Sequence, residues 1–407
     1  MRRRWQRWGA TVIGLLVLGA AVFVGANRVL LKRYFTQADN NGIGGMAWYA
    51  PTEVVPGRHS GFFPVVAERE RTISAAALRA ASEYAARNLS ESLLVWQGGK
   101  LQLARYWLNN QPDSLVNSRS MHKMLASLLV GRAIALGDIG GLDDSVAAYI
   151  GAWRDTDKAA MTIRNVLQMS SGLRWFNAEP GPFSVGVRRY LDPYWDRILL
   201  ERVGLSFPPG SAYDYSDITA DVLPHVIQGA SGERYAAYLG NNLLAPIGAM
   251  GGKIWVNRAG GMPHGGCCLM LPPETWLRLG ILVLQRGRWE NQQLLPEDWF
   301  ESMTTPSPNN EHFGLMLWLG QPYHERRLYH RPDSPRNQVA KPGVYHSEPY
   351  LADDLVLFDG AEGRTVFIVP SRQLVIVRTG FRPPPGQPEW DNAFLPNTIL
   401  RGMAAQP

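Results

Sequence analysis

Four consecutive residues, Ser120-Met121-His122-Lys123, place a hydroxyl and an amine three positions apart at the start of an apolar run. Residues three apart on a helix lie on the same face, so a helix here would hold Ser120 beside Lys123. A serine hydroxyl becomes a nucleophile when a neighbour takes its proton; a lysine whose pKa is shifted so that it loses its own proton can do this, or its ammonium form can polarise a third group. The helix N-terminus would also direct N–H groups toward an oxyanion. The pattern predicts acyl transfer, and its simpler alternative is an N-cap serine with a solvated lysine.

The elements that must position this motif follow from the patterns on either side of it. The apolar run MLASLLVGRAIALG after Ser120 predicts a helix with a buried stripe, and the alanine-rich residues 73–88 predict an amphipathic helix. Residues 93–96 and 101–106 are rich in strand formers and flank Gln-Gly-Gly-Lys, which predicts a hairpin.

The rest of the chain alternates a helical block with a return to strands. Residues 120–280 show a mainly helical pattern that Gly and Pro loops interrupt, and residues 365–369 and 374–378 read as a second antiparallel pair. The expected fold class is therefore α+β. An antiparallel sheet is built from both chain ends and flanked by helices, with a mainly helical region inserted between the two strand pairs.

Several blocks of the sequence, in order, resemble the serine β-lactamase-related family, which includes class C-type β-lactamases, penicillin-binding proteins and esterase-like relatives. Ser-x-x-Lys is the nucleophile motif of that family. LLVWQGGKLQLARYW resembles its opening hairpin, TIRNVLQMSSGLRW its L-L-x-M/H-x-S-G-L segment, and PGSAYDYSDITADVLPH the stretch that holds the Tyr-x-Asn motif. The resemblance covers residues 75–380, and the wording is most similar to the 6-aminohexanoate-dimer hydrolases. It implies a β-lactamase/transpeptidase-like fold.

Carried onto this sequence, the resemblance assigns roles to individual residues. Ser120 would be the acylated nucleophile, Tyr215 the base, and Lys123 the cation that holds down the pKa of the tyrosine. Tyr213 is the alternative base if the register slips by two residues. Asp217 stands where the family has asparagine, so it either neutralises Lys123 or binds a cationic group of the substrate.

The third motif of the family lines the site from a strand, and its candidate here is Phe-Asp-Gly-Ala-Glu-Gly-Arg at residues 358–364. Gly360 and Gly363 match the glycines of the Gly-x-x-Gly-Gln version, and Arg364 stands in the place of glutamine. Glycine allows a backbone N–H to approach the substrate, so this strand would supply a second oxyanion donor beside the Ser120 amide. The three residues are therefore predicted to bind substrate, and a plain hairpin turn is the alternative.

The N-terminal residues predict delivery to or across a membrane. An uncharged run at residues 9–26 follows an arginine cluster, which is typical of a signal peptide or of a single anchor, so residues 1–32 are assigned to either. The Gly- and Pro-rich residues 33–72 are assigned to a linker that wraps the body, and residues 73–405 to a serine hydrolase domain. The body would then lie in the periplasm, attached to the inner membrane or exported.

Composition excludes other partners and cofactors. Seven Arg and Lys residues precede residue 36 without one acid, so the remainder of this +6 chain is nearly neutral and no nucleic-acid partner is expected. No metal-binding spacing occurs, and we predict no metal and no cofactor. The adjacent Cys267 and Cys268 are interpreted as buried, unbridged residues.

The predicted function is hydrolysis of an amide or ester bond in a small molecule or short peptide, through an acyl-enzyme intermediate. Two alternatives stay open. One is a D-alanyl-D-alanine carboxypeptidase or penicillin-binding protein, and the other is a non-catalytic sensor that keeps the fold.

Overall fold

A six-stranded antiparallel sheet forms the centre of the molecule, and its strand order is β3-β2-β14-β13-β12-β9. Strand β2 from the first third of the chain pairs with β14 near its end, with Leu94 opposite Val377. This pairing confirms that the sheet is built from both chain ends. The strands span Ser90–Gln97 (β2), Lys100–Tyr106 (β3), Trp318–Leu319 (β9), Val356–Gly360 (β12), Arg364–Val369 (β13) and Leu374–Gly380 (β14). This computed structural model describes residues 2–37, 49–174, 181–334, 337–338 and 341–403.

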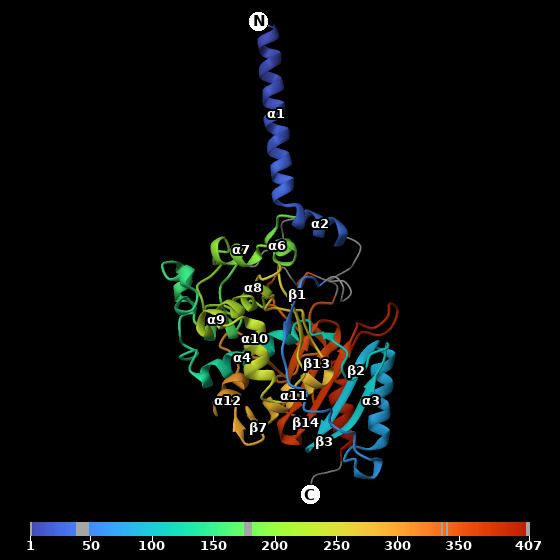
Figure 1. Ribbon diagram of the computed structural model, residues 1–407. Coiled ribbons are helices and arrows are strands. Elements are labelled where there is room, and N and C mark those ends of the chain that lie inside the picture. Colours follow the sequence, from blue (N-terminus) through green and yellow to red (C-terminus); the bar gives the residue numbers. More distant parts are fainter. Residues whose placement is uncertain (1, 38–48, 175–180, 335–336, 339–340, 404–407) are drawn as a thin grey trace.

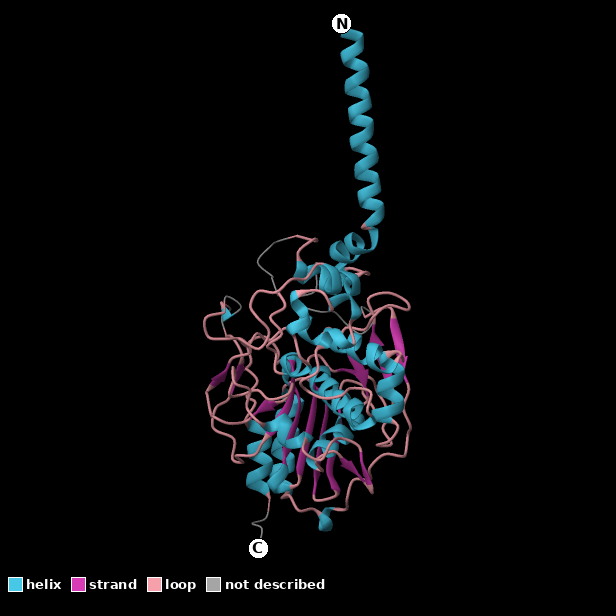
Figure 2. Ribbon diagram, turned by 90° about the vertical axis from the view of Figure 1, so that its left-hand side faces the viewer, coloured by secondary structure: helices cyan, strands magenta, loops and turns pink. Residues whose placement is uncertain are grey.

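Helices cover both faces of the sheet (Figures 1 and 2). Helix α3 (Ala75–Arg87) packs against α13 (Phe394–Gly402) on one side. Helix α11 (Pro273–Leu284) packs on the other against β13 and β14. All residues of β13 and β14 are buried, which is why these strands read as continuous apolar runs and not as alternating patterns. The expected α+β architecture is thus confirmed.

Helix α4 (Met121–Leu136) carries the Ser-x-x-Lys motif into the interior. Every residue from Met121 to Gly131 is buried, so this part of the helix has no face toward solvent. The sequence predicted burial of one stripe only. Gly137 ends the helix in the left-handed conformation, with φ 82°. A helix enclosed in this way holds its first turn rigidly.

The inserted region is mainly helical, as expected. Its helices are α5 (Ile163–Leu167), α6 (Val185–Leu191), α7 (Trp195–Glu201), α8 (Asp217–Ala220), α9 (Val222–Ser231), α10 (Tyr235–Leu239) and a π-helical turn (Gly240–Leu244). Further short elements include β7 (Arg288–Trp289), β8 (Gln292–Gln293), α12 (Trp299–Thr304), β10 (Arg326–Arg327) and β11 (Val344–Tyr345).

A second, four-stranded sheet joins the segment before residue 73 to the middle of the chain. Its order is β1-β5-β6-β4, with β1 at Thr52–Val55, β5 at Gly252–Trp255, β6 at Leu269–Leu271 and β4 at Val116–Asn117. Helix α2 (Arg28–Gln37) also contacts the body, since Arg33 donates to the carbonyls of Leu191 and Asn257. The part of residues 33–72 that the structure describes therefore does more than link: strand β1 completes a sheet.

The first helix, α1 (Arg2–Ala26), projects away from the body (Figure 1). Its residues from Thr11 to Ala26 are exposed, including large apolar side chains such as Leu16 and Val22. Within the described residues, no single helix has the length and apolar character to cross a membrane. One pair, Thr11–Ala26 with Arg28–Thr36, meets those criteria together and is bent by 69°.

Candidate active site

Ser120 and Lys123 meet at the N-terminus of α4. The Nζ of Lys123 lies 3.0 Å from the Oγ of Ser120, and the Ser120 side chain caps no helix N–H. The side chain of Lys123 has no exposed surface. The alternative of a capping serine with a solvated lysine therefore does not describe this pair.

Tyr215 completes a group of three side chains. Its ring centre lies 4.9 Å from the Nζ of Lys123, and its hydroxyl interacts with Ser120. Burial raises the pKa of Tyr215, and the Lys123 charge and the Ser120 hydrogen bond lower it less than burial raises it. Lys123 therefore lowers the pKa of Tyr215, as expected, but the pKa as a whole is raised above its ordinary value because burial has the larger effect. Tyr213 packs edge-on against Phe313 and does not line the cavity at Ser120.

Asp217 lies directly against Lys123, with 2.5 Å between Oδ1 and Nζ. Its second oxygen accepts a hydrogen bond from the hydroxyl of Tyr190 at 2.6 Å and lies 3.3 Å from a guanidinium nitrogen of Arg189. Of the two predicted roles, this contact corresponds to neutralising Lys123. Burial raises the pKa of Asp217, but Arg189 and Lys123 lower it further, so the carboxylate stays ionised.

The same carboxylate fixes the charge of Lys123. Burial lowers the pKa of the lysine, but Asp217 and Tyr215 outweigh burial and raise it above its ordinary value. The Nζ of Lys123 also donates to the carbonyl of Gly266 at 2.6 Å. Lys123 is therefore an ammonium ion in the resting site, held by three acceptors.

Gly360 and Gly363 border the same cavity as Ser120, whereas Arg364 does not. A Cβ at Gly360 would lie 2.7 Å from the carbonyl of Ser118, so the end of β12 approaches the residues before the nucleophile more closely than a side chain would allow. Strand β9 pairs only with Val356 and Leu357, which leaves the last residues of β12 without a β9 partner on that edge. Gly363 has φ +73°, a conformation that favours glycine.

The assignment of Arg364 to substrate binding needs correction. Its side chain is 2% exposed and forms ion pairs with Glu362 and, at 3.5 Å, with Glu91. Arg364 lies opposite Gly360 in the β12–β13 pairing, and its guanidinium turns into this acidic cluster and not toward Ser120. It holds Glu362, which does line the cavity.

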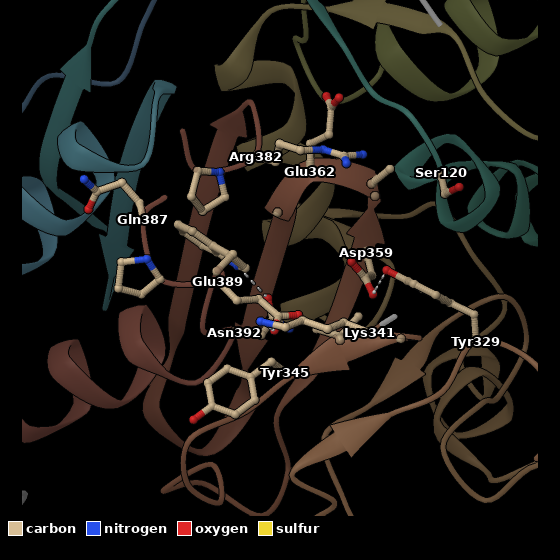
Figure 3. A pocket seen from close by; sticks show the side chains of 18 of the residues that line it. Ser120, Tyr329, Lys341, Tyr345, Asp359, Glu362, Arg382, Gln387, Glu389 and Asn392 are labelled. Atoms are coloured by element: carbon tan, nitrogen blue, oxygen red, sulfur yellow. Dashed lines mark hydrogen bonds and ion pairs between the residues drawn. The ribbon is translucent and has the colours of Figure 1, made fainter. Parts of the chain in front are cut away.

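The cavity at Ser120 has a volume of about 1130 Å³ and is bordered by polar and aromatic side chains (Figure 3). Its lining includes Asp359, Tyr329, Lys341, Arg382 and Trp390. Asp359 accepts a hydrogen bond from Tyr329 at 3.1 Å and a short one from Arg327. No sequence motif marks Tyr329, Lys341, Arg382 or Trp390, whereas Asp359 stands inside the third motif at residues 358–364.

Two cysteines near Lys123 also differ from expectation. Cys267 and Cys268 are buried, as predicted, but the structure joins them in a disulfide.

His122 is fully buried; its Nε2 lies 2.9 Å from the hydroxyl of Tyr235, and its Nδ1 lies 3.2 Å from the carbonyl of Cys267. Burial lowers the pKa of His122 to about 4, so this imidazole is neutral. It is part of the buried packing around α4.

One group of side chains in the described residues could hold a metal ion. Glu311, His312 and His324 place one ligand atom each within 4.8 Å of one another. None of the three borders the cavity at Ser120.

A serine in contact with a buried lysine and a buried tyrosine, between the start of an α-helix and a strand of an antiparallel sheet, is an arrangement typical of acyl-transfer sites. The Beta-lactamase family model matches residues 77–287, which is just over half of the chain. The chain therefore belongs to the serine β-lactamase-related family.

Solved structures share this fold at low sequence identity. The "Putative 6-aminohexanoate-dimer hydrolase from Bacillus anthracis" has a TM-score of 0.64 at 16% identity and aligns over 84% of this chain and 88% of its own. A penicillin-binding protein homologue from Caulobacter crescentus has a TM-score of 0.59 at 13% identity, over 82% and 99%. A D-stereospecific amidohydrolase from Streptomyces has 0.54 at 16%, over 81% and 100%. No curated protein sequence matches this chain.

Proposed function

We propose that this chain hydrolyses an amide or ester bond through an acyl-enzyme formed on Ser120. The observation that carries the proposal is the contact of the Ser120 hydroxyl with both Lys123 and Tyr215 at the wall of a large cavity. A cavity of about 1130 Å³ accommodates a small molecule or a short peptide.

In the acylation step, the oxygen of Ser120 bonds to the substrate carbonyl carbon while Tyr215, as phenolate, takes the hydroxyl proton. The carbonyl π electrons move to oxygen, and backbone N–H groups at the start of α4 and the end of β12 face that charge. The tetrahedral centre then expels the amine or alkoxide, which receives the proton from Tyr215. Water attacks the ester in the second half, Tyr215 removes its proton, and Ser120 recovers it.

The resting pair of Lys123 and Tyr215 carries one proton too many for this route. Since the pKa of each group is raised, the pair is ammonium and phenol near neutral pH and must lose one proton before attack. Activity should therefore rise with pH until the pair has lost that proton.

The test is covalent labelling of Ser120 with a fluorophosphonate, followed by mass spectrometry of the modified peptide. We expect one label per chain on Ser120 and none in Ser120→Ala. A Ser170→Ala variant is the matched control and should label like the wild type. Absence of label from the wild type at any pH between 6 and 10, with no amide or ester turnover, would refute the proposal and favour a non-catalytic sensor.

Within this reaction, we propose a linear amide of the 6-aminohexanoate-dimer type as the substrate class, which the fold likeness and the open cavity support. The competing substrate is the D-alanyl-D-alanine end of a cell-wall peptide, which the likeness to a penicillin-binding protein homologue supports. Incubation with fluorescent penicillin separates them. A long-lived label on Ser120 would favour the peptidase, and rapid amide turnover without such a label would favour the amidase.

We also propose that α1 anchors the protein in the inner membrane with the body on the periplasmic side. The support is the exposed apolar face from Thr11 to Ala26 and the arginines that precede it in the sequence. Cleavage of residues 1–32 as a signal peptide is the competing outcome.

A further inference from the structure

Four charges of alternating sign lie in a row that starts beside Ser120; three of them are buried, and Asp217, whose side chain is 19% exposed, borders the cavity. Lys123 contacts Asp217 at 2.5 Å, Asp217 contacts Arg189 at 3.3 Å, and Arg189 binds Asp221 through two hydrogen bonds of 2.9 and 3.0 Å. Lys123 and Arg189 have no exposed side-chain surface, and Asp221 is 2% exposed. The row begins at Lys123 and ends at Asp221, the residue between α8 and α9, and its two positive and two negative charges balance.

The backbone at Gly266 closes this row from the opposite side. Its carbonyl accepts from Lys123 at 2.6 Å, and its N–H donates to Asp221 at 3.2 Å. A Cβ at this position would lie 2.7 Å from Arg189 and 2.8 Å from Asp217. The loop therefore fits against the charges only because residue 266 is glycine.

Arg189 is the group that the family motif does not account for. An asparagine at position 217 would add no charge beside Lys123, whereas a carboxylate buried there needs a second cation once Lys123 is engaged by Ser120. Arg189 supplies it from α6 and does not border the cavity, so it has no contact with substrate. It acts on the reacting groups through its contact with Asp217 and through its own positive charge near Lys123.

We propose that Arg189 is a positioning residue that sets the pH range in which Ser120 can be acylated, acting together with Asp217 on the proton that the Lys123 and Tyr215 pair must lose. This inference rests on the proposed function of Ser120. Arg189 and Asp217 act in opposite directions. The positive charge of Arg189 favours loss of the shared proton, and the negative charge of Asp217 opposes it.

Other titratable or charged groups also lie near this cluster, and none of them is substituted in the experiment below. The hydroxyl of Tyr190 on α6 donates a hydrogen bond to Asp217. The charges of Asp217 and Arg189 both act on His264, which lies in a loop. His122 lies beside Lys123 on α4, and Asp359 and Tyr329 face Tyr215 from the sheet side. Burial dominates the pKa of both histidines and lowers it, so both are neutral across the tested range.

The experiment measures the second-order rate of fluorophosphonate labelling of Ser120 between pH 6 and 10. In a plot of this rate against pH, the rising part of the curve is called the limb. Asp217→Asn should move the limb to lower pH and Arg189→Gln should move it to higher pH, each by about one pH unit or more. The matched control is Arg188→Gln on the same helix, whose residue pairs with Asp192 instead, and its limb should coincide with that of the wild type.

Arg189→Gln leaves Asp221 without its cation and can fail to fold. The double variant Arg189→Gln/Asp221→Asn removes that unpaired carboxylate and should still shift the limb upward, by less than the single variant, since Asp221 lies farther from Lys123. Labelled variants whose limbs stay at the wild-type pH would overturn the role of Arg189 while leaving the proposed function intact. A wild type that takes no label would overturn the proposed function itself.

Discussion

At the scale of single residues, the nucleophile group combines a local rule with a chain-specific change. Ser120 and Lys123 meet because they stand three apart on one helix, which any helix of this sequence would provide. The carboxylate at 217 then turns a neutral hydrogen-bonding position into a charged one. The consequence is a lysine kept as ammonium, so the proposed reaction gives proton transfer to Tyr215.

Replacement of Tyr215 by phenylalanine tests that assignment. We expect kcat/KM for an activated ester to fall by about 10²- to 10⁴-fold, because the variant loses its general base. Tyr213→Phe is the matched control, since this hydroxyl lies in the core away from the cavity, and it should stay within about twofold. Equal losses in the two variants, at equal thermal stability, would argue that Tyr215 has only a packing role.

At the scale of elements, the site depends on how closely the end of β12 approaches the start of α4. The Ser120 side is fixed by a helix enclosed in the core, and the β12 side by its pairing with β13. Gly360 has extended backbone, so its requirement comes from the nearby carbonyl of Ser118 and not from its own conformation.

Gly360→Ala should therefore separate β12 from the nucleophile. The added methyl group meets a backbone carbonyl that cannot rotate away, so we expect a loss of about 1–3 kcal/mol in the free energy of unfolding. We also expect kcat/KM to fall by about tenfold or more, because oxyanion contacts tolerate little displacement. Denaturant unfolding and ester kinetics measure the two effects. Gly141→Ala, where the new Cβ has no neighbour within 4 Å, should change neither quantity, and a harmless Gly360→Ala would contradict this account.

At the scale of the whole molecule, α1 and the catalytic body are joined through α2. Leu30 on α2 is buried and Arg33 is bonded to the body, so this helix belongs to the fold, whereas α1 exposes its apolar residues. The break between them lies at residue 27 and marks where the projecting helix can be removed.

A chain without residues 1–26 should keep the body and lose membrane binding. We expect the full-length chain to float with phosphatidylethanolamine and phosphatidylglycerol vesicles on a density gradient and the shortened chain to stay at the bottom. Both should label Ser120 at the same rate. Flotation of both chains would place the membrane contact on the body, and flotation of neither would refute the anchor.

The sequence by itself determined the features that depend on short spacings. These are the Ser120–Lys123 pair, the helix that carries it, both strand pairs and the α+β class, because helix and strand periodicities are local properties. The resemblance added Tyr215 and the position of the third motif. Residue types also located Asp217 as a departure, but they left its role open.

Only the tertiary structure decided which distant groups meet. Asp217 lies 94 residues and Gly266 lies 143 residues from Lys123 in sequence, and Arg189 reaches Asp217 from a third segment. The side to which Arg364 turns depends on strand register, which long-range pairing fixes, so a motif match could not show that it leaves the cavity. The charges of Lys123, Arg189, Asp217 and Asp221 likewise balance one another only because folding brings their segments together.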